Sequence, residues 1–170
     1  PYFEEETGQA FVAGIKVLVE VSVEFHELYG YSLTVLNIDP TYTLGDMARR
    51  RREILKQLDE EGVLTLNKEL ELPLLTQRIA VISSATAAGY GDFCNQLEHN
   101  PYGFVFYPRL FPAVMQGDRV EETIIAALDT INARRDDWDV VVIIRGGGAT
   151  SDLSGFDTYD LAANCAQFPL

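Results

Sequence analysis

The chain has 170 residues, of which 26 are acidic and 13 are basic, and its formal net charge at pH 7 is −13. This length predicts one domain together with a smaller unit, and it is enough to bury a hydrophobic core without disulfides or metal ions. The charge argues against nucleic-acid binding by overall attraction, and the lack of any apolar stretch near the roughly 20 residues of a membrane span predicts no membrane partner.

Residues 1–40 are expected to be β structure. Apolar and polar residues alternate over residues 15–25 and again over residues 32–38, as in strands with one wet face. Between them, Tyr29-Gly30-Tyr31 predicts a turn, so the two segments should form a β-hairpin. A single hairpin is marginally stable in water. We therefore expect it either to pack on the rest of the chain or to belong to a larger sheet.

Residues 41–76 predict a connecting helix followed by a linker. Pro40 is expected to end the β region, and apolar residues then recur at helical spacing from Thr43 to a stop at Gly62. The basic run 49–52 lies inside this helix, among nearby acidic residues that balance its charge. It predicts a solvated helix face rather than a nucleic-acid patch.

Residues 77–170 predict an α/β domain. Strands are expected at 78–84, 104–111 and 139–144, with helices from Asp92, from Asp118 and over residues 158–166. Asp118 has Glu121 three residues later, which predicts a capped start for the second of these helices. The order β-α-β-α-β-α predicts a doubly wound parallel sheet of three βα units. The buried stripe of the second helix is predicted to be Val120, Ile124, Ala127, Leu128 and Ile131.

The run of five β-branched residues at 140–144 lacks the alternation of a half-exposed strand. It predicts a strand covered on both faces, in the middle of the sheet. Cys94 and Cys165 fall on predicted helices and outside any zinc-ligand spacing. We expect both to be free thiols in a reducing cytosol, which predicts a cytoplasmic protein.

Two loops, 83–92 and 145–157, should meet at the carboxyl edge of this sheet, where α/β proteins bind ligands. Arg145 offers a fixed positive charge suited to phosphate, and Asp92 offers a carboxylate that could act as a general base or orient water. The expected phosphate-binding groups are Ser83, Ser84, Thr86, Gly146, Gly147, Gly148 and Asp152.

Simpler interpretations of the same residues stay open. The glycine loop could be a flexible turn with Arg145 paired to a carboxylate, and Asp92 could serve only as a favourable acid in the first turn of a helix. The glycine spacing matches neither the dinucleotide-binding fingerprint nor the phosphate loop of ATPases. An ordinary dinucleotide or ATP site is therefore not predicted.

Several segments carry a resemblance to a known family. They are residues 145–153 (RGGGATSDL) followed by Phe156-Asp157, residues 82–88 leading to Asp92, Gln116-Gly117, and residues 29–33. In this order, and over nearly the whole chain, the sequence resembles the large subunit of exodeoxyribonuclease VII.

The resemblance implies processive exonucleolytic cleavage of single-stranded DNA from either end, giving short oligonucleotides. It implies that residues 1–40 are the last strands of an OB-fold, residues 41–76 a connector, and residues 77–170 the first part of the catalytic domain. Asp92 and Arg145 match family catalytic residues by motif position. Single-stranded DNA and several small subunits are the implied partners. Family members differ in their need for Mg²⁺, so the resemblance implies no particular metal and the sequence requires none.

Two departures from the family pattern have consequences. Ala149 and Asp157 stand where the family usually has Ser and Asn, so hydrogen bonding there differs. The family's catalytic His and a second Asp lie in a Gly-His-Glu segment shortly after the point reached at Leu170, so the 170-residue chain alone is expected to be inactive. The rival functions are a nucleotide- or phosphate-binding module without catalysis and a structural subunit.

Overall fold

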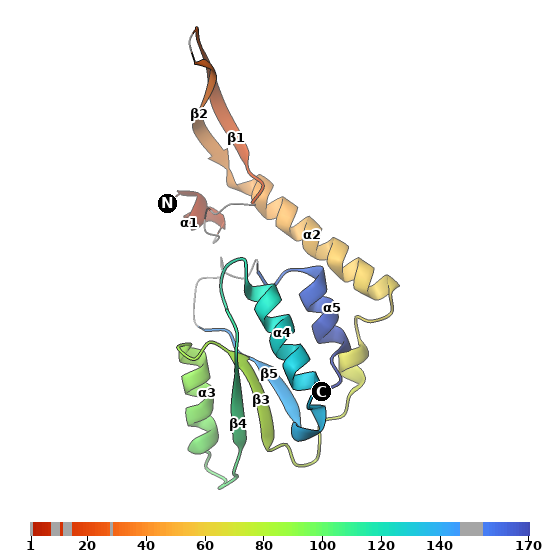
Figure 1. Ribbon diagram of the computed structural model, residues 1–170. Helices are drawn as coiled ribbons and strands as arrows, with labels where there is room; N and C mark the ends of the chain where they lie inside the picture. Colours follow the sequence, from red (N-terminus) through yellow and green to blue (C-terminus); the bar gives the residue numbers. More distant parts are fainter. Residues whose placement is uncertain (1, 8–10, 12–14, 28, 147–154) are drawn as a thin grey trace. The chain divides into compact units, whose positions relative to one another are not determined.

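The computed structural model describes residues 2–7, 11, 15–27, 29–146 and 155–170, and these form two compact units that divide between Glu53 and Ile54 (Figure 1). The first contains an antiparallel hairpin, and the second contains a parallel sheet with its helices. The expected α/β architecture with a preceding hairpin is confirmed at this level.

The hairpin consists of β1 (Leu18–His26) and β2 (Gly30–Asp39), joined by a turn in which Gly30 has a φ of 73°. Pairing is antiparallel, with one irregularity between Glu20 and Val21. The predicted hairpin is confirmed. The prediction of β structure at the start of the chain is wrong, because α1 (Tyr2–Thr7) is a helix. This segment has no apolar alternation, and its acidic first turn favours a helix start.

One face of the hairpin is apolar and exposed. Val23 pairs with Leu33 and Phe25 with Tyr31, and the Phe25 and Tyr31 rings lie 5.1 Å apart. These four side chains are 60–77% exposed. Contiguous exposed apolar area of this kind typically marks a surface that contacts another layer of protein.

The sequence predicts that Pro40 ends the β region, and in the structure the same residue also begins helix α2 (Pro40–Glu60). Pro40 is the first helical residue, a position that tolerates proline because its missing N–H needs no partner there. The Asp39 carboxylate accepts hydrogen bonds from the Thr41 N–H (2.9 Å) and hydroxyl (2.6 Å), which lower the pKa of Asp39. Asp39 thus caps the helix.

The basic run at 49–52 lies on the surface of α2, as predicted. Arg49 and Arg50 pair with Asp46 at 2.7 and 3.1 Å, and Arg49 also approaches Glu53. These ion pairs join residues three and four apart on one helix and are exposed on the arginine side. They account for the charge of the first half of the run.

The second unit holds a parallel sheet with the strand order β4 (Tyr107–Pro112), β3 (Arg78–Ser83), β5 (Val140–Ile143). Its helices are α3 (Ala88–Glu98), α4 (Val120–Asn132) and α5 (Tyr159–Gln167). Two 3-10 helices, η1 (Leu66–Glu69) and η2 (Arg135–Asp137), lie in the connections.

The position predicted for the β-branched strand is wrong. Among the described strands β3 is central and β5 is at the edge, and residues Ile79–Ser83 of β3 are buried whereas Ile143 of β5 is 37% exposed. A run of Val and Ile indicates strong β propensity, but it does not indicate whether other strands pair with it on one side or on both.

Helix α4 has the predicted buried stripe, which packs in one core with Ala80, Ile82, Leu161 and Phe168. The predicted cap at Asp118 is wrong, because the helix starts at Val120 with Arg119 as its cap. No helix in the described part of the chain has both the length and the apolar character needed to cross a membrane.

The Asp139 carboxylate joins the start of β3 to the start of β5 by hydrogen bonds. It accepts hydrogen bonds from the backbone N–H groups of Gln77 (2.9 Å) and Arg78 (2.7 Å) and from Arg78 Nε (3.0 Å). These bonds hold the pKa of Asp139 well below its ordinary value, at about 2. Because the carboxylate bridges two strands, it fixes the sheet at the end opposite the loops that follow them.

Candidate functional site

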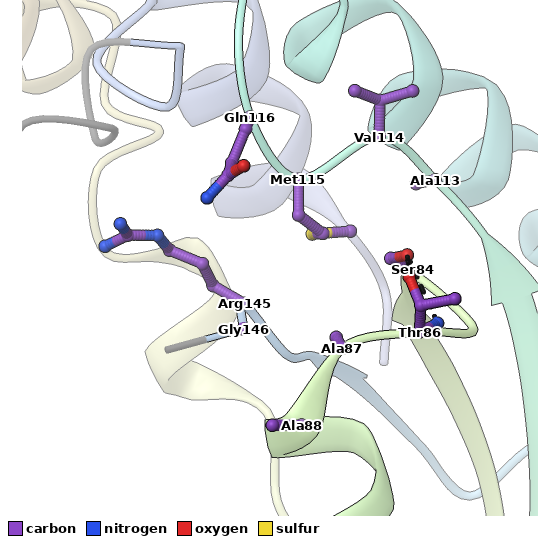
Figure 2. Close-up of a pocket in the computed structure, with 10 residues that line it drawn as sticks. All are labelled: Ser84, Thr86, Ala87, Ala88, Ala113, Val114, Met115, Gln116, Arg145 and Gly146. Carbon is purple, nitrogen blue, oxygen red and sulfur yellow. Dashed lines mark hydrogen bonds between the residues drawn. The ribbon is translucent and has the colours of Figure 1, made fainter. Parts of the chain in front are cut away.

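A cavity of about 590 Å³ lies at the carboxyl edge of the sheet (Figure 2). This volume is within the range typical of small-ligand sites. Segments that follow β3, β4 and β5 all contribute to it. The lining residues are Ser84, Thr86, Ala87, Ala88, Ala113, Val114, Met115, Gln116, Arg145 and Gly146.

The two loops predicted to converge do so. A Cβ added at Gly146 would lie 3.4 Å from the Ala87 Cβ, and one added at Gly89 would lie 3.0 Å from the Arg145 carbonyl oxygen. The segment after β3 therefore contacts the segment after β5 directly. Of the predicted phosphate-binding residues, Gly147, Gly148 and Asp152 lie outside the described residues.

Ser83 was predicted to bind phosphate, but it does not line the cavity. Its side chain is fully buried, and its hydroxyl donates a hydrogen bond of 2.6 Å to the Ile144 carbonyl. The backbone carbonyl of Ser83 accepts from the Ala113 N–H at 2.9 Å. A hydroxyl proton committed inside the sheet is not offered to a ligand, so Ser83 leaves the set of phosphate-binding candidates.

Ser84 and Thr86 do line the cavity. Their hydroxyl oxygens are 3.1 Å apart, and the Ala87 N–H closes a turn onto the Ser84 carbonyl at 3.0 Å. The turn presents both hydroxyls on the same side of the cavity (Figure 2). The two hydroxyls are hydrogen-bonded to each other, so one of them donates to the other, and both can donate to the oxygens of one phosphate only after that bond is broken.

Helix α3 begins at Ala88, four residues before the predicted start. Gly89 falls in the predicted loop 83–92, but in the structure it is a helical residue in tight contact with Arg145. The cap residue, Ala87, has no side-chain acceptor for the first N–H groups. Because Ala87 and Ala88 line the cavity, the positive end of this helix faces a potential anion.

Arg145 is half-buried and lines the cavity next to Gly146. Its side chain lies on the same side of the cavity as Gln116, and Met115 lies between this pair and the Ser84–Thr86 pair (Figure 2). The cavity therefore combines a guanidinium, an amide and two hydroxyls around an apolar wall. Such a set can bind an anion and stabilise charge that develops on it.

The loop after β4 was missed as part of the site. Gln116 was noted only for its likeness to a family motif, and no role was predicted for Met115 or Ala113. A usable signal existed, because β4 is parallel to its neighbours and its carboxyl end must meet the same edge of the sheet.

Asp92 lies in the second turn of α3, where its side chain is exposed, and it is not one of the residues that line the cavity. It follows Gly89 by three residues, so the two share one side of the helix. That side contacts Arg145 through Gly89. Asp92 is thus on the appropriate side of α3 but at the periphery of the site.

Among the described residues, no group of three or more His, Cys, Asp or Glu side chains lies close enough together to hold a metal ion.

Comparison with known proteins gives a consistent result. The family described as "Exonuclease VII, large subunit" matches residues 63–170. A protein named "Exodeoxyribonuclease 7 large subunit" from Deinococcus radiodurans is 35% identical over 165 residues, which are 96% of this chain and 40% of the relative. Proteins of the same name from Lactobacillus johnsonii and Shewanella sediminis are 34% and 32% identical over 85% and 89% of the chain, which are 31% and 34% of those relatives. The chain thus spans about two fifths or less of their length, and it belongs to the exonuclease VII large-subunit family.

Proposed function

We propose that this chain is part of the catalytic large subunit of an exonuclease that hydrolyses phosphodiester bonds of single-stranded DNA to give oligonucleotides. The observation that carries the proposal is the cavity at the carboxyl edge of the sheet. Arg145, the hydroxyls of Ser84 and Thr86, and the uncapped start of α3 all lie around it. Membership of the exonuclease VII family supports a phosphodiester of DNA as the phosphate that binds at this site.

In this proposal Arg145 binds the non-bridging oxygens of the scissile phosphate and stabilises the charge that builds up on them. Ser84, Thr86 and the backbone N–H groups of Gly146, Gly147 and Gly148 donate further hydrogen bonds.

Asp92 orients the attacking water or takes its proton. Attack of the water oxygen on phosphorus breaks the bond to the leaving sugar oxygen, which takes up a proton from solvent water. Because Asp92 is exposed at the periphery of the cavity, bound DNA has to bring its phosphate to that side of α3.

We further propose that residues 1–40 belong to an OB-fold, residues 41–76 connect it to the catalytic part, and residues 77–170 begin a doubly wound catalytic domain. The exposed apolar face of the hairpin supports the first assignment, because a barrel would cover it. Ile79 and Val81 support the last. They are buried on the face of β3 opposite Ala80 and Ile82, so both faces of the sheet are covered.

The proposed partners are single-stranded DNA and the small subunits of exonuclease VII, in the cytoplasm. Cys94 and Cys165 are free thiols, as proteins of a reducing compartment commonly have. A large subunit, by its name, has a small one with which to assemble.

The test is Arg145→Lys in the complete large subunit, assembled with its small subunits and assayed on end-labelled single-stranded DNA. Lys keeps the charge but loses the planar fork, so we expect the rate to fall at least about tenfold. Arg135→Lys is the matched control, because Arg135 lies in η2, before the amino end of β5, and is exposed. If Arg145→Lys retains the wild-type rate while the control does too, Arg145 has no part in catalysis and the proposal fails.

A second candidate function is phosphate or nucleotide binding without catalysis. The position of Asp92 outside the cavity lining favours it, because the described residues then supply anion binding but no proton acceptor at the cavity itself. Tight binding of a mononucleotide with none of an oligonucleotide, measured by calorimetry, supports this candidate. Preferential binding of oligonucleotides supports the nuclease.

A further inference from the structure

The backbone that carries Arg145 is held at the residue before it. The Ile144 N–H donates to the Ile82 carbonyl at 2.9 Å, which continues the β3–β5 pairing one residue beyond β5. The Ile144 carbonyl accepts a 2.6 Å hydrogen bond from the hydroxyl of Ser83. The backbone N–H and the backbone carbonyl of Ile144 are therefore both hydrogen-bonded to residues of β3.

Helix α3 contacts the same backbone at Gly89. A Cβ there would lie 3.0 Å from the Arg145 carbonyl oxygen and 3.3 Å from the Ile144 Cγ2. Gly89 has an ordinary helical φ, since it is not among the described residues with positive φ. The need for glycine at this position is therefore one of space rather than of backbone conformation.

We propose that Ser83 and Gly89 are positioning residues that fix the main chain of Ile144 and Arg145, so that the guanidinium enters the cavity in one orientation. This inference rests on the proposed catalytic role of Arg145. The direction of a side chain follows from the placement of its own backbone, and displacements of about 1 Å in an active site reduce rates strongly. A serine with a fully buried hydroxyl and a glycine in backbone contact supply that placement without touching the DNA.

The closing experiment is a double-mutant cycle in the complete large subunit with its small subunits. Ser83→Ala is expected to lower kcat about tenfold or more while KM for single-stranded DNA changes less than about twofold. In the Arg145→Lys background, Ser83→Ala is expected to lower kcat little further. The guanidinium that Ser83 is proposed to position is already absent from that variant. An equal factor in both backgrounds means that Ser83 only supports the fold, and the inference is then wrong.

Gly89→Ala and Gly91→Ala provide a matched pair on the same helix. Nothing lies within 4 Å of a Cβ added at Gly91, so Gly91→Ala is expected to leave kcat unchanged and raise the melting temperature slightly. Gly89→Ala is expected to lower kcat, again with no further effect in the Arg145→Lys background. This pair decides the question even if Ser83→Ala fails to fold, and equal kcat values for the two variants overturn the role of Gly89.

The cycle separates the two proposals. If Arg145→Lys alone leaves the rate unchanged, the proposed function fails. If Arg145→Lys lowers the rate but Ser83→Ala and Gly89→Ala act independently of it, only the positioning role fails.

Discussion

The hairpin and the parallel sheet are both rich in β-branched and aromatic residues, yet they bury them very differently. In β3 the side chains Val81 and Ile82 are fully buried, whereas in the hairpin Val23 and Phe25 are 60% and 65% exposed. The parallel sheet has helices over it and a core of its own. The comparison shows that strand propensity alone does not locate a core.

The largest expected effect is a core truncation in the second unit. Ile124 in α4 is fully buried, so Ile124→Ala should lower the free energy of unfolding by about 2–5 kcal/mol. Leu33→Ala on the hairpin should lower it by less than about 0.5 kcal/mol, because the side chain is already exposed. Urea denaturation of the 170-residue chain measures both. Similar losses for the two variants would mean that the hairpin face is buried in solution.

The second prediction concerns acid stability. The pKa of Asp139 falls from 3.8 to about 2 on folding, so its stabilising contribution is complete above pH 4 and disappears as the pH falls towards 2. The shift corresponds to about 1–2 kcal/mol, since half of the Arg78 side chain is exposed and its share is screened.

Asp139→Asn should remove this contribution and flatten the pH dependence of unfolding between pH 4 and 2. Asp136→Asn is a suitable control, because the Asp136 side chain is 98% exposed and lies 3.9 Å from Arg135. An unchanged acid transition in Asp139→Asn would show that the carboxylate does not fasten the two strands.

The third prediction uses two glycines of opposite surroundings. A Cβ at Gly155 would lie 2.8 Å from the Gly117 carbonyl oxygen and 3.0 Å from the Val120 Cβ. Gly155→Ala should therefore destabilise the second unit by about 1–3 kcal/mol. Gly45 in α2 has open space, so Gly45→Ala should stabilise by up to about 1 kcal/mol. Thermal unfolding of both variants gives the signs, and a stabilising Gly155→Ala would contradict the close packing at the start of α4.

The smallest effect is expected from a charge on the hairpin face. In the 170-residue chain Leu33→Glu should change the free energy of unfolding by less than about 0.5 kcal/mol, because the side chain stays in water. In the complete large subunit the same change should cost several times more if an OB-fold covers this face. Equal, small effects in both proteins would argue against the barrel.

Features set by local periodicity were predictable from the sequence. The stripe Val120, Ile124, Ala127, Leu128 and Ile131 follows from a 3.6-residue repeat and appears in full. The hairpin follows from a two-residue repeat on either side of the turn at Gly30, although its irregularity between Glu20 and Val21 does not. The convergence of two loops followed from the β-α order, because parallel strands end at one edge of their sheet.

Features set by partners distant in the sequence were not predictable. The hydroxyl of Ser83 bonds to a residue 61 positions away, and no local pattern distinguishes it from the neighbouring Ser84. The central position of β3 depends on which strands flank it. The same limit applies to Asp92, whose sequence position at a loop end did not reveal that it lies outside the cavity lining.

The hydrogen bonds at both ends of β5 bear on the register in which this strand pairs with β3. A run of valines and isoleucines looks nearly the same after sliding two residues along β3, since every side chain keeps its face, so apolar packing alone discriminates poorly against such a slip. A two-residue slip would carry Arg145 about 7 Å along the sheet and away from the cavity. Asp139 bonds to Gln77 and Arg78 at one end, and Ile144 bonds to Ser83 at the other. These directional contacts can be made in a single alignment only, so the polar groups at the two ends define the register in which the guanidinium reaches the cavity.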